Sequence, residues 1–565
     1  MSTTHPQQND GEVALEDGFD HEDSADLSSQ VSSSLKWAFA AQLVFRIGNL
    51  ATNIALARIL TQGEIGVFAV ASTILLTLLN LNDMGLVWGL VRHQGPINRR
   101  AQSAVTLAMA FSGAVALVMV GFSGPLAGLY GGRAAAPLVQ VLALTVLFDA
   151  LVSVPNAILV RELREKERAV IDLGSLLVQI PVSIGFALSG AGAWSLVWGR
   201  IAGSSTATVL AMRAIGYIPR PGWDRNDARE LMQFGVPLAM GGLMFFGILN
   251  LDYLIVGNLL GEEQLGIYWV AFNVSFWPVM FITTTTRRVT ISIFAKVQDD
   301  IERLRAGFAT AIELMMLLAI PTSLGLAIFS REIVVTLYGE RWEAGAVPLR
   351  FLALTGLVRI VAMLMRDVIT AKGHSRAIRN TDGLWIIALF PALIVAVRTD
   401  GLRGAGIAQL VVVSFVALPI YAWILHRDGV AFHHYKAGLI RPLLGAVAMA
   451  TVGLFLRAAL DGLAPPLLAI VAGPPAGLVF FAVALTPARA RELMSFFRNP
   501  APVPKPEPTP SQPLPPAVLA AVPPPCTDKA NGSPVKPASD TPTFRLNIDN
   551  PPPQRLDQPG HDRSP

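Results

Sequence analysis

The residues Ile65-Gly66-Val67-Phe68-Ala69-Val70-Ala71 open one apolar run, and two hundred residues later Leu265-Gly266-Ile267-Tyr268-Trp269-Val270-Ala271 open another. Further matches follow in the same order, at offsets of up to 214 residues: Leu129-Tyr130-Gly131 with Leu337-Tyr338-Gly339, Leu142-Ala143-Leu144-Thr145 with Leu352-Ala353-Leu354-Thr355, and Gly190-Ala191-Gly192 with Gly404-Ala405-Gly406. Apolar sequences resemble one another by chance, but ordered matches at a nearly constant offset indicate an internal repeat.

The composition predicts a membrane protein. The chain has 565 residues, of which 52% are hydrophobic and 15% are charged, with a mean hydropathy of +0.51. A soluble domain carries about 25% charged residues, so an ordinary soluble enzyme is excluded. A helix needs about 20 apolar residues to cross a bilayer, and fourteen such runs lie between residues 35 and 486. We therefore expect an all-α integral membrane protein with about 14 transmembrane helices.

The runs divide the chain into six parts. Two end segments are too polar or too rich in proline to build a core, and we expect them to be disordered. The predicted parts are an acidic N-terminal tail (1–34), an N-terminal six-helix lobe (35–215), a cytoplasmic linker (216–234), a C-terminal six-helix lobe (235–425), a last helix pair (426–486), and a cytoplasmic proline-rich tail (487–565).

Lysine and arginine in the short loops predict the orientation, because cytoplasmic loops carry an excess of both. One alternating set of loops holds 22 of these residues and the other set holds 6. Both termini are therefore expected in the cytoplasm. Six runs per repeat give both repeats the same direction, which predicts two lobes related by an axis along the membrane normal. That plan is typical of an alternating-access transporter with its substrate site between the lobes.

Polar residues inside the apolar runs indicate where that site lies, because a charged side chain within a bilayer usually faces a cavity or a partner. Guanidinium groups suit a phosphorylated substrate, since their planar fork donates two parallel hydrogen bonds to phosphate. Amides and a deep aromatic ring suit sugars. The candidate substrate-binding residues are Arg46, Asn49, Asn53, Arg200, Asn273, Trp277, Arg359 and Arg366.

Three intramembrane carboxylates are candidates for ion coupling or for pairing with the arginines: Asp83, Asp149 and Asp252. In the register of the repeat, Asp149 is equivalent to Arg359. A purely structural interpretation stays open, in which Arg46 pairs with Asp149 or Asp83. In that interpretation Arg200 and Arg366 extend toward the headgroups.

No catalytic, metal or cofactor motif accompanies these residues. The sequence contains no GxxxxGK[ST] loop, no nucleophile elbow and no histidine spacing typical of a metal site. The single cysteine, Cys526, excludes a cysteine-based zinc or iron–sulfur site. We expect neither an enzyme nor a cofactor. The positive charge follows the predicted topology, so no nucleic-acid partner is expected.

Six short segments carry a resemblance to a known family: Arg46-Ile47-Gly48-Asn49, Ala57-Arg58-Ile59-Leu60-Thr61, Glu64-Ile65-Gly66-Val67-Phe68-Ala69, Asp83-Met84-Gly85-Leu86, Leu90-Val91-Arg92 and Asp252-Tyr253-Leu254-Ile255-Val256-Gly257. They resemble bacterial polysaccharide flippases of the Wzx type, which belong to the multidrug/oligosaccharidyl-lipid/polysaccharide exporter superfamily. The resemblance covers about residues 35–486, and the two tails depart from the family's pattern. It identifies the family better than any single site.

The resemblance implies a function in polysaccharide assembly. It implies that the protein moves an undecaprenyl-pyrophosphate-linked oligosaccharide across the inner membrane, for exopolysaccharide, capsule or O-antigen, with its lipid tail in the bilayer. Polysaccharide polymerase or export proteins are possible partners. The alternatives are a multidrug exporter, a lipid II flippase of the same superfamily, or a non-transporting scaffold of a polysaccharide synthase complex. Arginine-rich runs argue against the multidrug exporter, because cavities for organic cations favour carboxylates.

Overall fold

The computed structural model describes residues 41–82, 97–162, 164–216, 221–297 and 301–485, and every regular element in these ranges is helical. Ten stretches of the described residues are long and apolar enough to cross a membrane. The longest stretch, of 52 residues, turns at Asp400 and Gly401, where glycine adopts the φ of +54° that other residues avoid. It therefore contains two of the predicted runs. The all-α architecture is confirmed, whereas the count of fourteen crossings stays a prediction.

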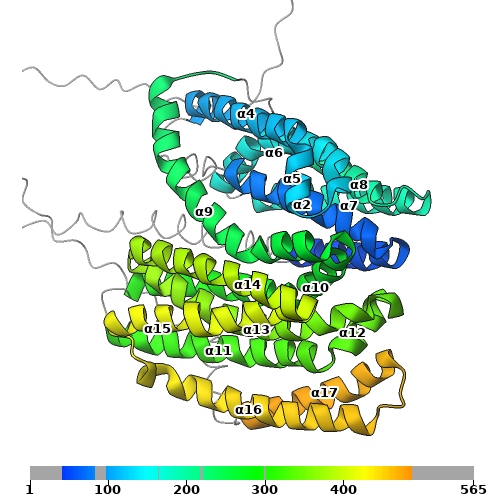
Figure 1. Cartoon of the computed structure of the whole chain (residues 1–565). Coiled ribbons are helices and arrows are strands. Elements are labelled where there is room, and N and C mark those ends of the chain that lie inside the picture. Colours follow the sequence, from blue (N-terminus) through cyan, green and yellow to red (C-terminus); the bar gives the residue numbers. More distant parts are fainter. Residues whose placement is uncertain (1–40, 83–96, 163, 217–220, 298–300, 486–565) are drawn as a thin grey trace, which may run out of the picture. The chain divides into compact units, whose positions relative to one another are not determined.

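The first repeat comprises a helix over residues 41–59 and the elements α2 to α8. In chain order these are α2 (Gln62–Asn82), α4 (Ile97–Gly121), α5 (Ser123–Leu129), the 3-10 turn η1 (Arg133–Ala135), α6 (Ala136–Arg161), α7 (Glu165–Leu188) and α8 (Trp194–Ile215). Helices α7 and α8 pack along each other, and α6 packs against both α4 and α8 (Figure 1). Leu142, Val146 and Leu159 of α6 are fully buried, so this helix is the centre of the repeat.

The second repeat comprises α9 to α15, and α16 and α17 follow it. The elements are α9 (Arg225–Leu260), α10 (Glu262–Val297), α11 (Ile301–Ile328), α12 (Ser330–Tyr338), the 3-10 turn η2 (Glu340–Gly345), α13 (Ala346–Ala371), α14 (Ser375–Val412), the π-turn η3 (Val413–Ala417), α15 (Leu418–Arg427), α16 (Phe432–Ala459) and α17 (Pro465–Ala484). Helix α13 packs against α10, α11 and α14 and has the central place that α6 has in the first repeat.

The last helix pair is joined to the second repeat by an ion pair. Arg457 of α16 donates from Nε to Glu332 Oε1 at 2.9 Å and from Nη1 to the carbonyl of Ile328 at 2.9 Å. Glu332 is 4% exposed. Apolar residues of α17, Leu468 and Ala472, pack on the same end of α11. The pair α16–α17 is therefore an addition to the second repeat, and the described residues of the first repeat contain no counterpart.

Helix α9 connects the two repeats and contacts both. Asp224 begins it, because its Oδ1 accepts from the backbone N–H of Asn226 at 2.9 Å, as an N-cap does. The first turns pack on α4 and α6 through Ala228 and Leu231. The last turns pack on α2, α10 and α14 (Figure 1). Most of the predicted linker is thus the start of this 36-residue helix.

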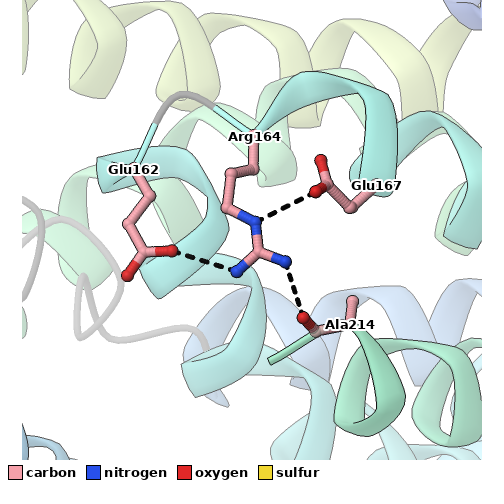
Figure 2. A network of polar contacts seen from close by, with 4 residues as sticks. All are labelled: Glu162, Arg164, Glu167 and Ala214. Carbon is pink, nitrogen blue, oxygen red and sulfur yellow. Dashed lines mark hydrogen bonds and ion pairs between the residues drawn. The ribbon is translucent and has the colours of Figure 1, made fainter. Parts of the chain in front are cut away.

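Corresponding loops of the two repeats are fixed in the same way. Arg164 donates from Nη2 to the carbonyl of Ala214 at 2.7 Å and also binds Glu162 and Glu167, as Figure 2 shows. The hydrogen bonds to Glu162 and Glu167 raise the pKa of the Arg164 guanidinium. In the second repeat, Lys372 Nζ donates to the carbonyl of Asp428 at 2.8 Å. Each bond joins the loop before a helical hairpin to the end of that hairpin.

Candidate functional site

The helix over residues 41–59 presents three predicted site residues, Arg46, Asn49 and Asn53, and all three side chains are half-buried. Spacings of three and four residues place them on one face. Asn49 donates from Nδ2 to the carbonyl of Phe45 at 2.9 Å, within its own helix. Arg46 has no hydrogen-bonded or ion-paired partner among the described residues. This face therefore offers a cationic group and an amide that remain available to a ligand.

Arg200 of α8 and Asp149 of α6 form the second group in the first repeat. Both are half-buried, and their opposite charges interact electrostatically without a direct hydrogen bond. The Nε of Arg200 is buried and finds no acceptor within the described part of the chain. A buried donor without an acceptor is costly, so this position favours an anionic or hydrogen-bond-accepting ligand. Asp83, the other carboxylate of this repeat that is predicted for ion coupling or for pairing with the arginines, lies outside the described residues.

Asp252 of α9 lies at the centre of the polar cluster in the second repeat and is fully buried. Its Oδ2 accepts from the Tyr268 hydroxyl at 2.6 Å, and its Oδ1 accepts from the backbone N–H of Tyr253 at 3.0 Å. The carboxylate also interacts electrostatically with Arg359. A buried charge is tolerated when hydrogen bonds and an opposite charge compensate it, and Asp252 has two hydrogen bonds and the electrostatic interaction with Arg359.

Arg359 of α13 is 3% exposed, and its Nη2 donates to Gln409 Oε1 of α14 at 3.1 Å. Two donors of this pair, Arg359 Nε and Gln409 Nε2, lack acceptors among the described residues. The structure therefore places Arg359 in the interior of the second repeat, next to Asp252. A substrate would reach it only after the surrounding helices separate, which makes Arg359 a weaker candidate for direct contact than Arg46.

Arg366, seven residues further along α13, forms an ion pair with Asp382 of α14 at 3.0 Å. Asp382 is 3% exposed and also accepts from the Tyr421 hydroxyl at 2.6 Å. These contacts favour the structural interpretation of Arg366. Asn273 and Trp277 of α10 are half-buried, and Asn273 donates to the carbonyl of Trp269 at 2.8 Å in its own helix. Both remain candidates for contact with a sugar.

Three polar residues with structural importance were missed by the sequence analysis: Gln409, Asp382 and Glu313. Glu313 is 5% exposed in the middle of α11. The available signal was the same for all three, namely a polar or charged side chain inside or beside an apolar run. A metal ion has no evident place, because no group of three histidine, cysteine, aspartate or glutamate residues within the described ranges could hold one.

The predicted site residues thus form separate groups. In the first repeat the arginines are half-buried and lack direct partners among the described residues. In the second repeat Asp252, Arg359 and Gln409 contact or act on one another inside the helix bundle, and Arg366 is paired with Asp382. A surface with accessible guanidinium groups and amides can bind the phosphate and hydroxyl groups of an amphiphile. A closed, neutralised cluster cannot do so without rearrangement.

Comparison with solved structures shows the fold. The "Lipid II flippase MurJ, inward closed conformation" superposes with a TM-score of 0.66 at 12% identity, over 81% of this chain and 99% of that one. An inward-facing multidrug resistance MATE family transporter of the MOP superfamily gives 0.58 at 14% identity, over 70% of this chain and 98% of its own. The chain therefore has the helical fold of these two solved proteins.

Comparison of sequences identifies the family. The chain is 24% identical to "Lipopolysaccharide biosynthesis protein WzxC" of Escherichia coli K12, over 77% of this chain and 89% of the relative. It is 25% identical to "Succinoglycan biosynthesis transport protein ExoT" of Rhizobium meliloti, over 76% and 87%. The family model described as "Polysaccharide biosynthesis protein" matches residues 55–347. This match spans more than half of the chain and confirms the predicted resemblance, so the protein belongs to this family of polysaccharide biosynthesis proteins.

Proposed function

We propose that this multi-pass membrane protein is a flippase that moves a lipid-linked oligosaccharide across the inner membrane for the assembly of an extracellular polysaccharide. The family, the flippase and transport relatives and the MurJ-like fold support this proposal. The substrate would carry its sugars on undecaprenyl pyrophosphate and would enter from the cytoplasmic leaflet. Both termini are then cytoplasmic, as the distribution of lysine and arginine predicts.

One observation carries the proposal from fold to substrate, namely the half-buried guanidinium of Arg46 with no partner among the described residues. A cation in an apolar helix is expensive to maintain and is usually functional. Arginine binds phosphate through two parallel hydrogen bonds. Asn49 and Asn53 on the same face would bind sugar hydroxyl groups, and the lipid tail would remain in the bilayer. Arg200 would provide a second positive charge toward the pyrophosphate.

The experiment measures the leaflet in which the lipid-linked oligosaccharide accumulates. The host gene is deleted and complemented with wild type, with Arg46→Ala, or with Arg403→Ala as a matched control. Arg403 is an exposed arginine whose only described ion pair, with Asp400, is long at 3.5 Å. We expect wild type and Arg403→Ala to restore transfer to the periplasmic leaflet. Arg46→Ala should leave the intermediate on the cytoplasmic side although the protein is present in the membrane.

The other outcomes discriminate between functions. Normal transfer in the deletion strain, together with altered drug sensitivity, would replace the proposal by a multidrug exporter. Accumulation of lipid II in place of a polysaccharide intermediate would identify a lipid II flippase. If the Arg46→Ala protein transfers the intermediate as fast as wild type does, the guanidinium does not bind the substrate. Polymerase or export proteins as partners remain a prediction, which co-purification from the polysaccharide-producing host would test.

A further inference from the structure

The turn between α15 and α16 is held by side chains from two other parts of the second repeat. Arg305 of α11 donates from Nε to the carbonyl of Gly429 at 2.8 Å. Lys372, in the loop between α13 and α14, donates from Nζ to the carbonyl of Asp428 at 2.8 Å. His374 from the same loop places its Nδ1 3.1 Å from Asp428 Oδ2. These contacts fix the position of the turn relative to three helix ends.

The segment around this turn carries more positive charge than its contacts use. Asp428 is the single carboxylate in residues 426–441, and its side chain is only 14% exposed, against His374. Arg427, Lys436 and Arg441 are exposed, and none of them forms a hydrogen bond or an ion pair with another described residue. Three cations therefore face outward without a counter-charge from the described part of the chain.

The charges around the turn act together on His433, in the first turn of α16. Desolvation and the neighbouring positive charges lower the pKa of its imidazole, and those charges belong to His434, Lys436, Arg305 and His426. They come from α11, α15 and α16, so the ends of three helices produce one positive electrostatic potential. A positive potential at a protein surface attracts anions.

Two exposed aromatic rings accompany these cations. The guanidinium carbon of Arg427 lies 5.0 Å from the centre of the Trp423 ring, which is a cation–π contact. Trp423 is 58% exposed at the end of α15, and Phe432 is 60% exposed at the start of α16. Aromatic side chains of this kind gather at the boundary between the hydrocarbon and the headgroups of a bilayer. The two rings therefore mark that boundary on both sides of the turn.

An apolar stripe continues from Lys436 along α16. Ile440, Leu443, Leu444 and Val447 follow Lys436 at helical spacings, and all of these side chains are exposed. Helix α16 packs on α11 and α17 with its other sides. The stripe therefore faces the acyl chains of the bilayer, with a cation at the level of the headgroups.

Trp423, Arg427, Phe432, Lys436 and Arg441 are together called the headgroup patch below. We propose that the headgroup patch binds an anionic phospholipid, whose phosphate lies among the three cations and whose acyl chains lie along the stripe of α16. Basic sites beside transmembrane helices on the cytoplasmic side suit acidic lipid headgroups, and the sequence assigns this side to the cytoplasm. The patch contains none of the candidate substrate-binding residues, so the inference goes beyond the proposed transport function.

Lipid binding to the purified full-length protein tests the proposal. Native mass spectrometry counts the lipids retained during titration with dioleoyl phosphatidylglycerol or dioleoyl phosphatidylcholine, which have the same chains but differ in net charge. The site variant removes the three cations of the patch: Arg427→Gln, Lys436→Gln and Arg441→Gln. The matched control removes three exposed arginines from the loops that carry few lysine and arginine residues: Arg133→Gln, Arg398→Gln and Arg403→Gln.

We expect wild type to retain phosphatidylglycerol at a concentration at least about five-fold below that needed for phosphatidylcholine, because each cation near a headgroup favours the anionic lipid. The control variant should keep this preference, and the site variant should bind the two lipids equally. Added sodium chloride should weaken the preference of wild type, since salt screens exposed charges. If the triple variant is not recovered folded, Lys436→Glu replaces it and should lower the affinity for phosphatidylglycerol alone.

Three outcomes would overturn the proposal. Equal affinity of wild type for the two lipids would show that the cations do not select an anionic headgroup. A preference that survives in the site variant would place the bound lipid elsewhere. Residues 1–34 carry eight carboxylates and no lysine or arginine, so they are a rival occupant of the patch. A preference that arises only after removal of residues 1–34 would assign the patch to this acidic segment.

A second measurement locates the lipid, because dibrominated acyl chains quench the fluorescence of nearby tryptophan. The difference in emission between wild type and Trp423→Phe isolates the signal of Trp423. We expect brominated phosphatidylglycerol to quench this signal more strongly than brominated phosphatidylcholine at the same mole fraction. Trp198→Phe in α8 provides the control signal, since Trp198 is 40% exposed in the first repeat, and both lipids should quench it equally. Equal quenching of the Trp423 signal would contradict the proposal.

Discussion

The two repeats carry intramembrane charge in different ways, although they arise from one duplicated unit. In the first repeat, Arg46 and Arg200 are half-buried, and neither has a directly hydrogen-bonded acidic partner among the described residues. In the second repeat, Arg359 is 3% exposed beside the buried Asp252, and Arg366 is paired with Asp382. Arginine side chains are therefore available to a ligand in the first repeat, whereas in the second repeat they stabilise the packing of the helices. Position in a repeat does not determine the role of an arginine.

A physical reason follows from the cost of burial. Transferring an ion from water to an apolar interior is tolerated only when a counter-charge and hydrogen bonds satisfy it. Asp252 has Tyr268, the Tyr253 N–H and the field of Arg359. Arg46 does not need a protein counter-charge to the same degree, because its side chain is only half-buried. This difference predicts that substitution of a charged residue lowers mainly the stability of the protein in the second repeat and mainly the transport rate in the first.

The largest expected effect comes from Asp252→Ala. It leaves the Arg359 guanidinium buried without a counter-charge, a situation that costs about 3–5 kcal/mol. The apparent melting temperature of the detergent-purified protein should fall steeply, or the variant should not be recovered. The double variant Asp252→Asn with Arg359→Met removes both charges and should recover most of the loss. A single variant as stable as wild type would show that the cluster does not hold the second repeat together.

Arg366→Ala should have the next largest effect. The Asp382 carboxylate loses its ion pair but keeps the Tyr421 hydroxyl, so we expect a loss of about 2 kcal/mol. Thermal unfolding in detergent measures it, with Arg403→Ala as the surface control. Because the pair is structural in this interpretation, residual transfer per folded molecule should remain. If transfer disappears while the melting temperature is unchanged, Arg366 is a substrate residue and the contrast between the repeats is weaker than described.

Arg200→Ala should lower stability less than Asp252→Ala does, because no hydrogen bond of Arg200 is described and the contact that is lost is its electrostatic interaction with the half-buried Asp149. The melting temperature should therefore fall by less than that of Asp252→Ala. Transfer of the oligosaccharide should nevertheless fall well below wild type. A melting temperature that drops as far as that of Asp252→Ala would mean that the arginines stabilise the folded protein in both repeats.

The smallest effect is expected where the repeats agree. Arg164→Ala and Lys372→Ala each remove a loop-to-hairpin bond at equivalent positions, at partly exposed sites. Both should lower stability by at most about 1 kcal/mol, and by similar amounts. Side-by-side melting curves make the comparison. If the two variants lose very different amounts of stability, the two loops do not contribute equally, although each makes a bond to its hairpin at the equivalent position.

The sequence predicted the helical membrane fold and the repeat because both depend on long, local patterns. Apolar runs near 20 residues and recurring motifs such as Leu129-Tyr130-Gly131 need no tertiary information. The same sequence could not separate Arg46 from Arg359, since both are arginines in apolar runs. The surroundings of Arg359 include Asp252 and Gln409, which lie far from it in the sequence, and only the packing of the helices brings them together. The close approach of α2 and α10, where a Cβ on Gly66 would overlap the carbonyl oxygen of Glu262, is visible in the sequence only as a repeated glycine.

Helix α9 has a consequence for how the chain is made. Its first turns, with Ala228 and Leu231, complete the apolar cluster that includes Ala104 and Val154, although they lie beyond the six runs of the first repeat. When synthesis has reached residue 215, the apolar surface that Ala228 and Leu231 will cover is therefore still exposed. The unit that folds is longer than the unit that was duplicated. Expressed as two halves, the chain should associate better when it is divided after Leu260 than when it is divided at Gly216.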